Sequence, residues 1–259
     1  MSEVLFDVGT DGVAVVTLNN PARKNAVSIA AAQKLHELWA TVEERADIKV
    51  LVIAAAECGV FCAGMDLAEV SRVRSERGLE IHELLPDGYY DRLRNLGKPV
   101  VAALNGHFTA LGMLLAVHSD LRVGLAGSKA GITEARVGRG AAWTALMLDM
   151  VPKALVLELL LSAEMMPVER LREVGFLNYV EATPQAVNER AMALARSIAR
   201  NAPMSLSIGK AGLRKVGELG LEAGYAASRE MHLAVASSAD AAEGVRAFTE
   251  KRAPVWQGR

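Results

Sequence analysis

The chain has 259 residues, with 29 Lys and Arg against 30 Asp and Glu, so its formal net charge is −1. That charge attracts neither nucleic acid nor an anionic membrane, and neither is expected as a partner. Hydrophobic residues make up 51% of the chain and charged residues 23%, which excludes extended disorder and allows a sizeable core. Cys58 and Cys62 form neither a disulfide framework nor a zinc motif, so a reducing, cytoplasmic location is expected.

Two features bear on membrane association. The N-terminus lacks the basic and apolar regions of a signal peptide. Pro99–Ser119 carries no formal charge, but Asn105-Gly106 interrupts it, and His107 and His118 are polar. Because a spanning helix would bury those groups in lipid, we expect a buried strand, a turn and a buried helix instead.

Strand-like runs alternate with helical patterns in the first part of the chain. Ser28–Arg45 has apolar side chains at helical spacing, with Ser28 as its N-cap, and more polar helices are expected within 66–97. Val-rich runs bounded by Gly, Pro, Asn or Asp predict strands at Val13–Leu18, Val50–Ala54, Val100–Leu104 and Leu121–Leu125. This alternation predicts an α/β fold with largely parallel strands.

After Ala141 the strand signal fades and helical patterns follow one another, with prolines at their starts or boundaries. Helices are expected at Ala141–Met150, Lys153–Ser162, Val168–Val174, Pro184–Ala202, Ser205–Val216, Leu221–Ser237 and Ala239–Lys251. The chain is therefore divided into an α/β core, residues 1–195, and a C-terminal helical region, residues 196–259.

Two segments that follow predicted strands could bind a ligand. In 20–26, Arg23 and Lys24 could meet a phosphorylated ligand, although an isolated basic loop more often only faces solvent. In 59–67, a Gly-containing turn precedes a helix with acidic residues in its first turn. Such a turn leaves free backbone N–H groups for a carbonyl oxygen or phosphate, but an ordinary tight turn fits the pattern equally well.

Two further segments could carry chemistry. Segment 105–114 repeats the order of apolar strand, Gly-bearing turn and apolar helix. Two turns that each supply one N–H would form an oxyanion hole. In segment 130–135, Glu134 follows a strand among small and apolar residues, where desolvation would raise its pKa towards the range of a general base. A lone loop Glu is, however, more often solvated.

Other motifs are rejected. Gly138–Trp143 has two glycines of a dinucleotide fingerprint but lacks the third, and no clear strand precedes it, so NAD is not expected. The sequence has no nucleophile elbow, no phosphate-binding loop and no H-E-x-x-H motif. We therefore expect neither a metal nor a bound cofactor, and among the histidines only His107 is considered for the site.

The order and spacing of these segments resemble the crotonase, or enoyl-CoA hydratase/isomerase, superfamily. The resemblance covers essentially the whole chain: LNNPARKNAVS at 18–28, GVFCAGMDL at 59–67, KPVVAALNG at 98–106, HSDLRV at 118–123, GITEARVGRG at 131–140 and the tail at 243–259. It implies a crotonase-like spiral of repeated ββα units with a C-terminal α-helical trimerisation region. Such chains are often homotrimers or hexamers built as dimers of trimers.

The resemblance also implies roles for individual residues. The N–H groups of Met65 and Leu111 would form the oxyanion hole for a thioester oxygen, and Glu134 would be the catalytic acid/base. Coenzyme A would be part of the substrate, with its nucleotide end at Arg23, Lys24 and Ala26. Further substrate-binding positions would be Ala63, Gly64, Met65, Asp66, Leu67, Leu111, Gly112 and Leu114. Phe108, Trp143 and the helices of residues 70–97 are expected to shape the acyl pocket.

The third segment departs from the family pattern at one position. Typical hydratases carry a catalytic Glu where this chain has Leu114, whereas Glu134 retains the second hydratase carboxylate. Hydration requires water to be activated and a proton to reach C2, work that two carboxylates normally share. Moving a double bond from C3 to C2 needs only one group that shuttles a proton, so these residues slightly favour an isomerase. Asp66, His107 or a bound water could instead supply the missing group of an atypical hydratase.

Three classes of function are weighed. The favoured class is an acyl-CoA enzyme that stabilises a thioester enolate, in fatty-acid or related acyl-CoA metabolism. A non-catalytic acyl-CoA-binding homologue is disfavoured because Glu134 is retained. A serine peptidase on the same fold is disfavoured because no Ser nucleophile motif with a placed His and Asp is found.

Overall fold

A six-stranded sheet forms the centre of the molecule. The structure is a computed structural model, and it describes residues 2–85, 87–88 and 90–259. The sheet has the order β1-β2-β3-β5-β7-β10, and only the β1–β2 pair is antiparallel. Its strands are β1 (Val4–Val8), β2 (Val13–Leu18), β3 (Val50–Ala55), β5 (Val100–Leu104), β7 (Leu121–Leu125) and β10 (Tyr179–Glu181). The four predicted Val-rich strands and their parallel pairing are therefore confirmed.

A second, four-stranded sheet has the order β4-β6-β8-β9, parallel except for β8–β9. Its strands are β4 (Val60–Cys62), β6 (His107–Thr109), β8 (Lys129–Gly131) and β9 (Met166–Pro167). The expectation that strands end near Ala141 is wrong, since β9 and β10 lie beyond it. Each is only two or three residues long, which is too short for an alternating hydrophobic pattern to show.

The two sheets are connected by a repeated unit. A strand of the large sheet leads to a strand of the small sheet and then to a helix, as β3-β4-α2 (Leu67–Arg77), β5-β6-α4 (Leu111–His118) and β7-β8-η3 (Glu134–Val137). This is the predicted spiral of ββα units. Because β4, β6 and β8 are parallel neighbours, their carboxyl ends bring three distant chain segments to one edge.

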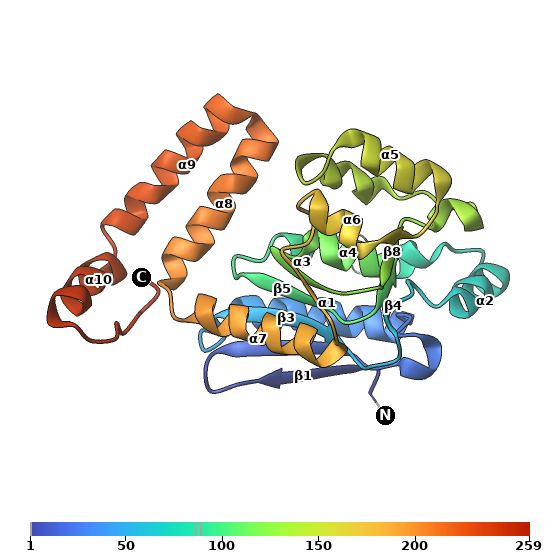
Figure 1. Ribbon diagram of the computed structural model, residues 1–259, viewed down its shortest axis with the longest axis horizontal. Coiled ribbons are helices and arrows are strands. Elements are labelled where there is room, and N and C mark those ends of the chain that lie inside the picture. The colour runs from blue at the N-terminus through green and yellow to red at the C-terminus, as the bar shows by residue number, and fades with distance from the viewer. Residues whose placement is uncertain (1, 86, 89) are drawn as a thin grey trace.

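Helices cover both faces of the large sheet (Figure 1). On one face lies α1 (Ile29–Glu44), whose N-cap Ser28 accepts a hydrogen bond from the N–H of Ala31, as expected. On the other lies α7 (Pro184–Ala199), which packs Val187, Ala191, Ala195 and Ala199 against the strands. The predicted boundary at residue 195 falls inside α7, whose last turn still contacts the sheet.

Several shorter helices precede α7 in the chain. The segment after α2 contains η2 (Ile81–Leu84) and α3 (Asp91–Arg94), and the chain after β8 contains α5 (Lys153–Ser162) and α6 (Val168–Glu173). The helix expected at Ala141–Met150 is present as a 3-10 helix, η4 (Ala142–Asp149), without a side-chain cap. η1 (Pro21–Arg23) is another short 3-10 turn. Pro99–Ser119 forms β5, β6 and the fully buried α4, as predicted, and no helix in the described ranges could span a bilayer.

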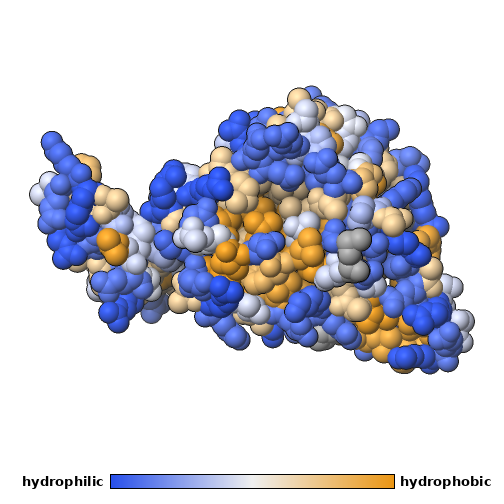
Figure 2. Space-filling view, turned by 90° about the horizontal axis from the view of Figure 1, so that it is seen from below, coloured by the Kyte–Doolittle hydropathy of each residue, from blue (hydrophilic) through white to orange (hydrophobic). Residues whose placement is uncertain are grey.

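The C-terminal helices project from the body as an arm. They are α8 (Pro203–Leu219), α9 (Leu221–Ala236) and α10 (Ala239–Glu250), with α8 and α9 packed as a hairpin. Figure 2 shows the arm beside a body face on which apolar surface gathers. The arm itself exposes large apolar side chains, with Leu213, Leu233 and Phe248 at least 70% exposed.

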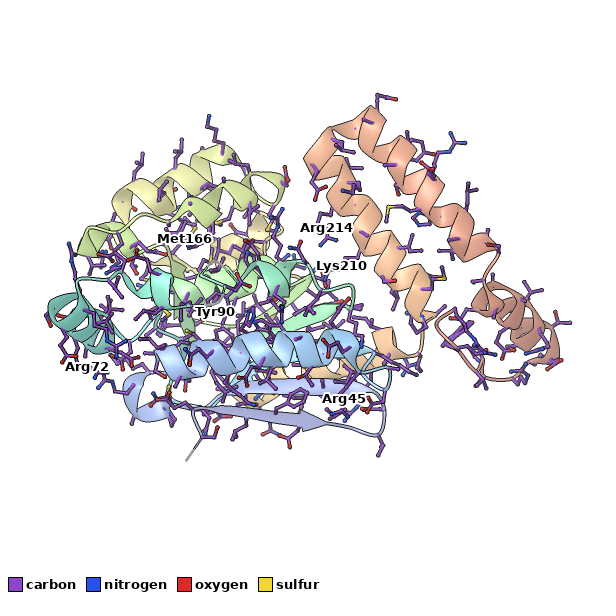
Figure 3. The ribbon with its side chains drawn as sticks, turned by 180° about the vertical axis from the view of Figure 1, so that it is seen from behind. Arg45, Arg72, Tyr90, Met166, Lys210 and Arg214 are labelled. Atoms are coloured by element: carbon purple, nitrogen blue, oxygen red, sulfur yellow. The ribbon has the colours of Figure 1, made fainter. Side chains whose placement is uncertain are left out.

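Two basic side chains fix α8 to the body. Lys210 Nζ lies 2.8 Å from Asp120 Oδ2 and 3.1 Å from the carbonyl oxygen of Lys98. The guanidinium of Arg214 donates to the carbonyl oxygen of Arg94 at 3.2 Å. Figure 3 shows both side chains extending from α8 towards the body.

Candidate active site

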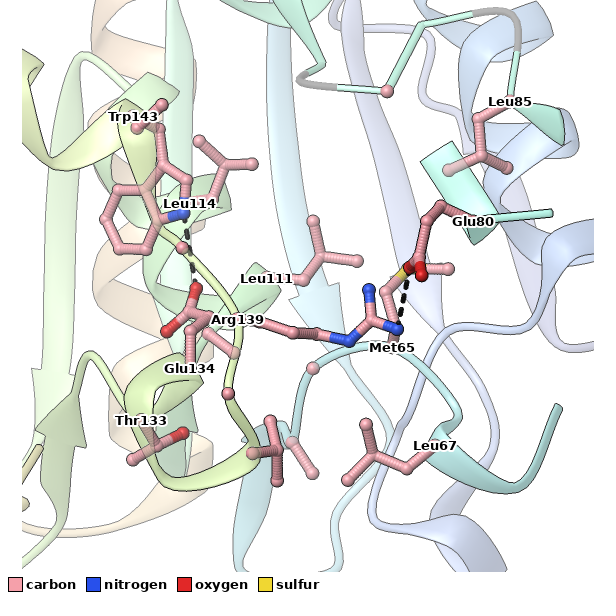
Figure 4. A pocket seen from close by; sticks show the side chains of 18 of the residues that line it. Met65, Leu67, Glu80, Leu85, Leu111, Leu114, Thr133, Glu134, Arg139 and Trp143 are labelled. Carbon is pink, nitrogen blue, oxygen red and sulfur yellow. Dashed lines mark hydrogen bonds and ion pairs between the residues drawn. The ribbon is translucent and has the colours of Figure 1, made fainter. Parts of the chain in front are cut away.

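A pocket of about 570 Å³ opens at the carboxyl ends of β4, β6 and β8. The turns after these strands supply part of its wall, and residues of α2, of the segment between α2 and α3, and of η3 and η4 supply other parts. Its lining comprises Ala63, Gly64, Met65, Leu67, Arg74, Glu80, Leu85, Gly88, Tyr90, Ala110, Leu111, Leu114, Thr133, Glu134, Val137, Gly138, Arg139, Gly140, Ala142 and Trp143. Most of these side chains are apolar or small (Figure 4).

Two turns in this wall present backbone N–H groups. Gly64 has φ +106° and Ala110 has φ +50°, so each turn has a residue with positive φ immediately before Met65 or Leu111. Within the described residues, neither the Met65 N–H nor the Leu111 N–H makes a hydrogen bond. The turns touch, since a Cβ added at Gly64 would lie 3.1 Å from the Ala110 Cβ. Two free donors therefore lie close together beside the pocket.

The first turn is held by segment 20–27. The Val27 N–H donates to the Gly64 carbonyl oxygen, and the Asp66 N–H to that of Val27, both at 2.9 Å. Ala63 N–H donates to the Lys24 carbonyl oxygen at 3.2 Å. These backbone bonds bring together two of the segments singled out from the sequence, and they fix the position of the Met65 peptide.

The Asp66 side chain is engaged outside the pocket. Its carboxylate caps α2 by accepting from the N–H groups of Ala68 and Glu69, and it lies 2.5 Å from an Arg23 guanidinium nitrogen. Arg23, Lys24, Ala26 and Asp66 thus lie beside the first turn, and none of them is among the lining residues.

Glu134 lines the pocket next to Trp143. Its Oε1 accepts a hydrogen bond from the Trp143 indole N–H at 3.3 Å, drawn as a dashed line in Figure 4. Its Oε2 is buried and has no hydrogen-bond partner among the described residues. Burial raises the pKa of Glu134, while the Trp143 N–H and nearby backbone amides oppose that rise. The expected direction of the shift is confirmed.

The remaining predicted positions divide into two groups. Leu114 lines the pocket and is 4% exposed, so this part of the wall is apolar. Gly112 instead packs below the pocket, where a Cβ would lie 2.5 Å from the Cys62 carbonyl oxygen. Phe108 is fully buried in the core and does not line the pocket, contrary to expectation. Trp143 does line it, as predicted.

His107 is used elsewhere in the fold. Its Nδ1 accepts a hydrogen bond from the Lys129 N–H at 2.9 Å, and the residue does not line the pocket. Across the described ranges, no group of three His, Cys, Asp or Glu side chains could hold a metal ion.

The pocket also contains an ion pair that the sequence does not indicate. An Arg139 guanidinium nitrogen lies 3.0 Å from a Glu80 carboxylate oxygen, and Figure 4 shows Arg139 extended across the pocket towards Glu80. Arg74 approaches the other Glu80 oxygen at 3.5 Å. The partners are distant in the chain, so no local spacing could have indicated the pair.

The spiral of ββα units and its pocket define a protein of the crotonase fold. The enoyl-CoA hydratase of Bacillus anthracis superposes with a TM-score of 0.92 at 25% identity, covering 100% of both chains. The enoyl-CoA hydratase of Mycobacterium tuberculosis H37Rv superposes with a TM-score of 0.87 at 31% identity, covering 99% of both.

Sequence comparison gives the same result. The family described as enoyl-CoA hydratase/isomerase matches residues 9–259. The 2,3-dehydroadipyl-CoA hydratase of Escherichia coli K12 is 32% identical over 95% of this chain and 96% of its own. The (E)-benzylidenesuccinyl-CoA hydratase of Thauera aromatica is 30% identical over the same shares of the two chains. The chain belongs to the enoyl-CoA hydratase/isomerase family and is an enzyme of that family.

Proposed function

We propose that this enzyme moves a double bond in an enoyl-CoA thioester by way of an enolate, with Glu134 as its one acid/base. The observation that carries the proposal is the content of one pocket. It combines two free N–H groups, at Met65 and Leu111, with a buried carboxylate oxygen that has no partner among the described residues.

The chemistry follows from these groups. The thioester oxygen accepts hydrogen bonds from Met65 and Leu111, which stabilise the negative charge when Glu134 Oε2 removes a proton from C2. The electron pair of the broken C–H bond moves into the enolate. Glu134 then returns the proton at C4, so a C3–C4 double bond becomes a C2–C3 double bond and nothing else is consumed. The apolar wall at Leu114 keeps Glu134 poorly solvated.

Hydration is the second candidate, because the relatives compared above are named as hydratases. It would require Glu134 alone to activate water and to supply the proton. Asp66 is occupied by a helix cap and by Arg23, and His107 by Lys129. Neither supports the role of a second acid/base, so isomerisation remains the better supported reaction.

We further propose positions for the rest of the substrate and for partner subunits. Arg23 and Lys24 lie beside the first turn, where their charges suit the phosphates of coenzyme A. Residues 196–259 would form the trimerisation region, which accords with the exposed apolar side chains of the arm. A role in fatty-acid metabolism and a cytoplasmic location remain predictions of the sequence.

The test is to incubate the protein with crotonyl-CoA and, separately, with a trans-3-enoyl-CoA, following the products by mass and chromatography. A 2-enoyl product without added water is expected. Glu134→Gln should reduce turnover by at least roughly 1,000-fold with little change in coenzyme A affinity. Glu164→Gln is the matched control, since that carboxylate is exposed and outside the pocket.

Other products would change the conclusion. A 3-hydroxyacyl-CoA product that disappears in Glu134→Gln would establish hydration without a second carboxylate. Coenzyme A binding with neither product would favour the non-catalytic acyl-CoA-binding alternative.

The pH dependence offers an independent check. Glu134 must be deprotonated to act as a base, so kcat/KM should rise with pH through its raised pKa. Trp143→Phe removes a hydrogen bond that lowers this pKa, so the acid limb should move to higher pH. The pH–rate profile of kcat/KM measures this. An unmoved limb in a normally folded variant would show that Glu134 does not control the rate.

A further inference from the structure

Two guanidiniums in the pocket share a single carboxylate. Among the described residues, the charged side chains that line the pocket besides Glu134 are Arg74, Glu80 and Arg139. Both guanidiniums approach the single Glu80 carboxylate, at 3.5 and 3.0 Å. The deprotonated Glu134 that the proposed function requires balances these charges over the whole pocket, but Glu80 is the one described carboxylate that pairs with Arg74 or Arg139, in a lining otherwise rich in Leu, Ala and Gly.

Arg139 is the more buried of the two guanidiniums. Its side chain is 29% exposed, whereas that of Arg74 is 71% exposed. The contact with Glu80 is an ion pair, and the guanidinium makes no hydrogen bond with any described residue. Its donors are therefore available to a planar anion that enters the pocket.

Arg139 also lies where an acyl chain could reach it. Figure 4 shows its side chain extending from the segment after Glu134 towards Glu80, and Leu111 lines the same pocket. Leu111 and Glu134 are the groups that would hold the thioester end and the reacting carbons. An acyl group that starts at those residues and ends in an anion would bring that anion to the guanidinium.

We propose that the acyl group of the substrate carries a second carboxylate, at the end remote from the thioester, and that Arg139 binds it. This inference rests on the proposed function, since it assigns the thioester to the same pocket. The incoming carboxylate gains a bidentate partner in a guanidinium that shares its one described carboxylate with Arg74. A hydrocarbon end would leave the Arg139–Glu80 pair in place and gain no charge interaction.

The test measures affinity without relying on turnover. Titration calorimetry would compare hexanoyl-CoA with the mono-CoA thioester of the six-carbon dicarboxylic acid, which differ only at the far end. The unsubstituted protein should bind the carboxylate-ended ligand at least about tenfold more tightly than hexanoyl-CoA. In Arg139→Gln that ratio should fall to about one, and in Glu80→Gln it should persist or increase, because the competing carboxylate is gone. Arg172→Gln, at an exposed position, controls for the loss of one positive charge.

Three outcomes overturn the proposal. Equal affinities for the two ligands would show that the pocket does not bind the second carboxylate. A ratio that Arg139→Gln leaves unchanged would assign the preference to another residue. An equal loss of affinity for both ligands in Arg139→Gln would show that Arg139 contacts the coenzyme A part of the ligand. Because both ligands are saturated, failure of the proposed isomerisation appears separately, as absent turnover of the matching 3-enoyl thioesters.

Discussion

The two turns beside the pocket both have a residue with positive φ before a free N–H group, but different contacts hold each turn in place. Gly64 at φ +106° precedes the free N–H of Met65, and Ala110 at φ +50° precedes that of Leu111. After the first turn, α2 is mostly exposed and is capped by a carboxylate. After the second, every residue of α4 is buried, and no side chain caps the helix.

The two turns hold their N–H donors in place in different ways. The first turn uses a residue that tolerates the backbone conformation, and it is fixed by hydrogen bonds to segment 20–27. The second places a residue with a Cβ in a strained conformation, at a cost on the order of 1–3 kcal/mol. Burial of α4 against the core offsets that cost. We therefore expect a side chain added at Gly64 to disturb the first turn. In the second turn, replacing Ala110 by glycine should relieve strain and stabilise the protein.

The largest effect is expected from Gly64→Ala. Alanine is strained at φ +106°, and its Cβ would lie 3.1 Å from the Ala110 Cβ. Relaxation would move the Met65 peptide, and loss of one oxyanion donor typically lowers kcat by roughly 100- to 1,000-fold. Steady-state turnover of the best thioester substrate measures this loss.

Two variants separate strain from loss of the donor. Gly127→Ala imposes a similar backbone strain at φ +74° with no atoms within 4 Å of the new Cβ, and Gly127 lies outside the pocket. It should lower stability but not kcat. Gly64→Ala combined with Ala110→Gly removes the methyl that the new Cβ meets, and it should recover part of the activity. Equal losses of kcat in Gly64→Ala and Gly127→Ala would contradict the assignment.

A smaller effect is expected from Asp66→Ala. It removes the cap of α2 and the ion pair with Arg23, and it should lower the free energy of unfolding by about 1–2 kcal/mol. The backbone bonds of Val27 remain, so turnover should fall much less than in Gly64→Ala. Denaturant unfolding measures the first effect and steady-state kinetics the second.

Asp66→Asn is the control that keeps a capping oxygen while removing the charge. It should retain most of the stability, because the exposed Arg23 contributes little through its ion pair. If Asp66→Ala instead abolished turnover while the protein stayed folded, the carboxylate would have a chemical role that the structure does not support.

The sequence could indicate both turns because each follows an apolar strand and contains glycine. It also predicted that burial would raise the pKa of Glu134, since small and apolar residues surround it in the chain. The short strands β4, β6, β8 and β9 gave no usable pattern, because they depend on neighbours in the sheet more than on their own residues. The Arg139–Glu80 pair depends on how η3 and the residues after α2 meet in space.

The sequence could not indicate the strained backbone of Ala110 either, because alanine rarely adopts a positive φ. Ala110→Gly should increase the free energy of unfolding by about 1 kcal/mol, since the relieved strain exceeds the roughly 0.4–1 kcal/mol that glycine loses through unfolded-state entropy. The expected rise in Tm is roughly 2–4 °C.

Ala163→Gly is the matched control, because Ala163 is buried with φ +52° and ψ +22°, in the ordinary left-handed region. Ala110 has ψ −117°, further from any region that alanine favours, so its gain should be the larger. Equal gains would mean that the second turn is no more strained than an ordinary helix end, and that burial of α4 is not what holds the Leu111 N–H in place.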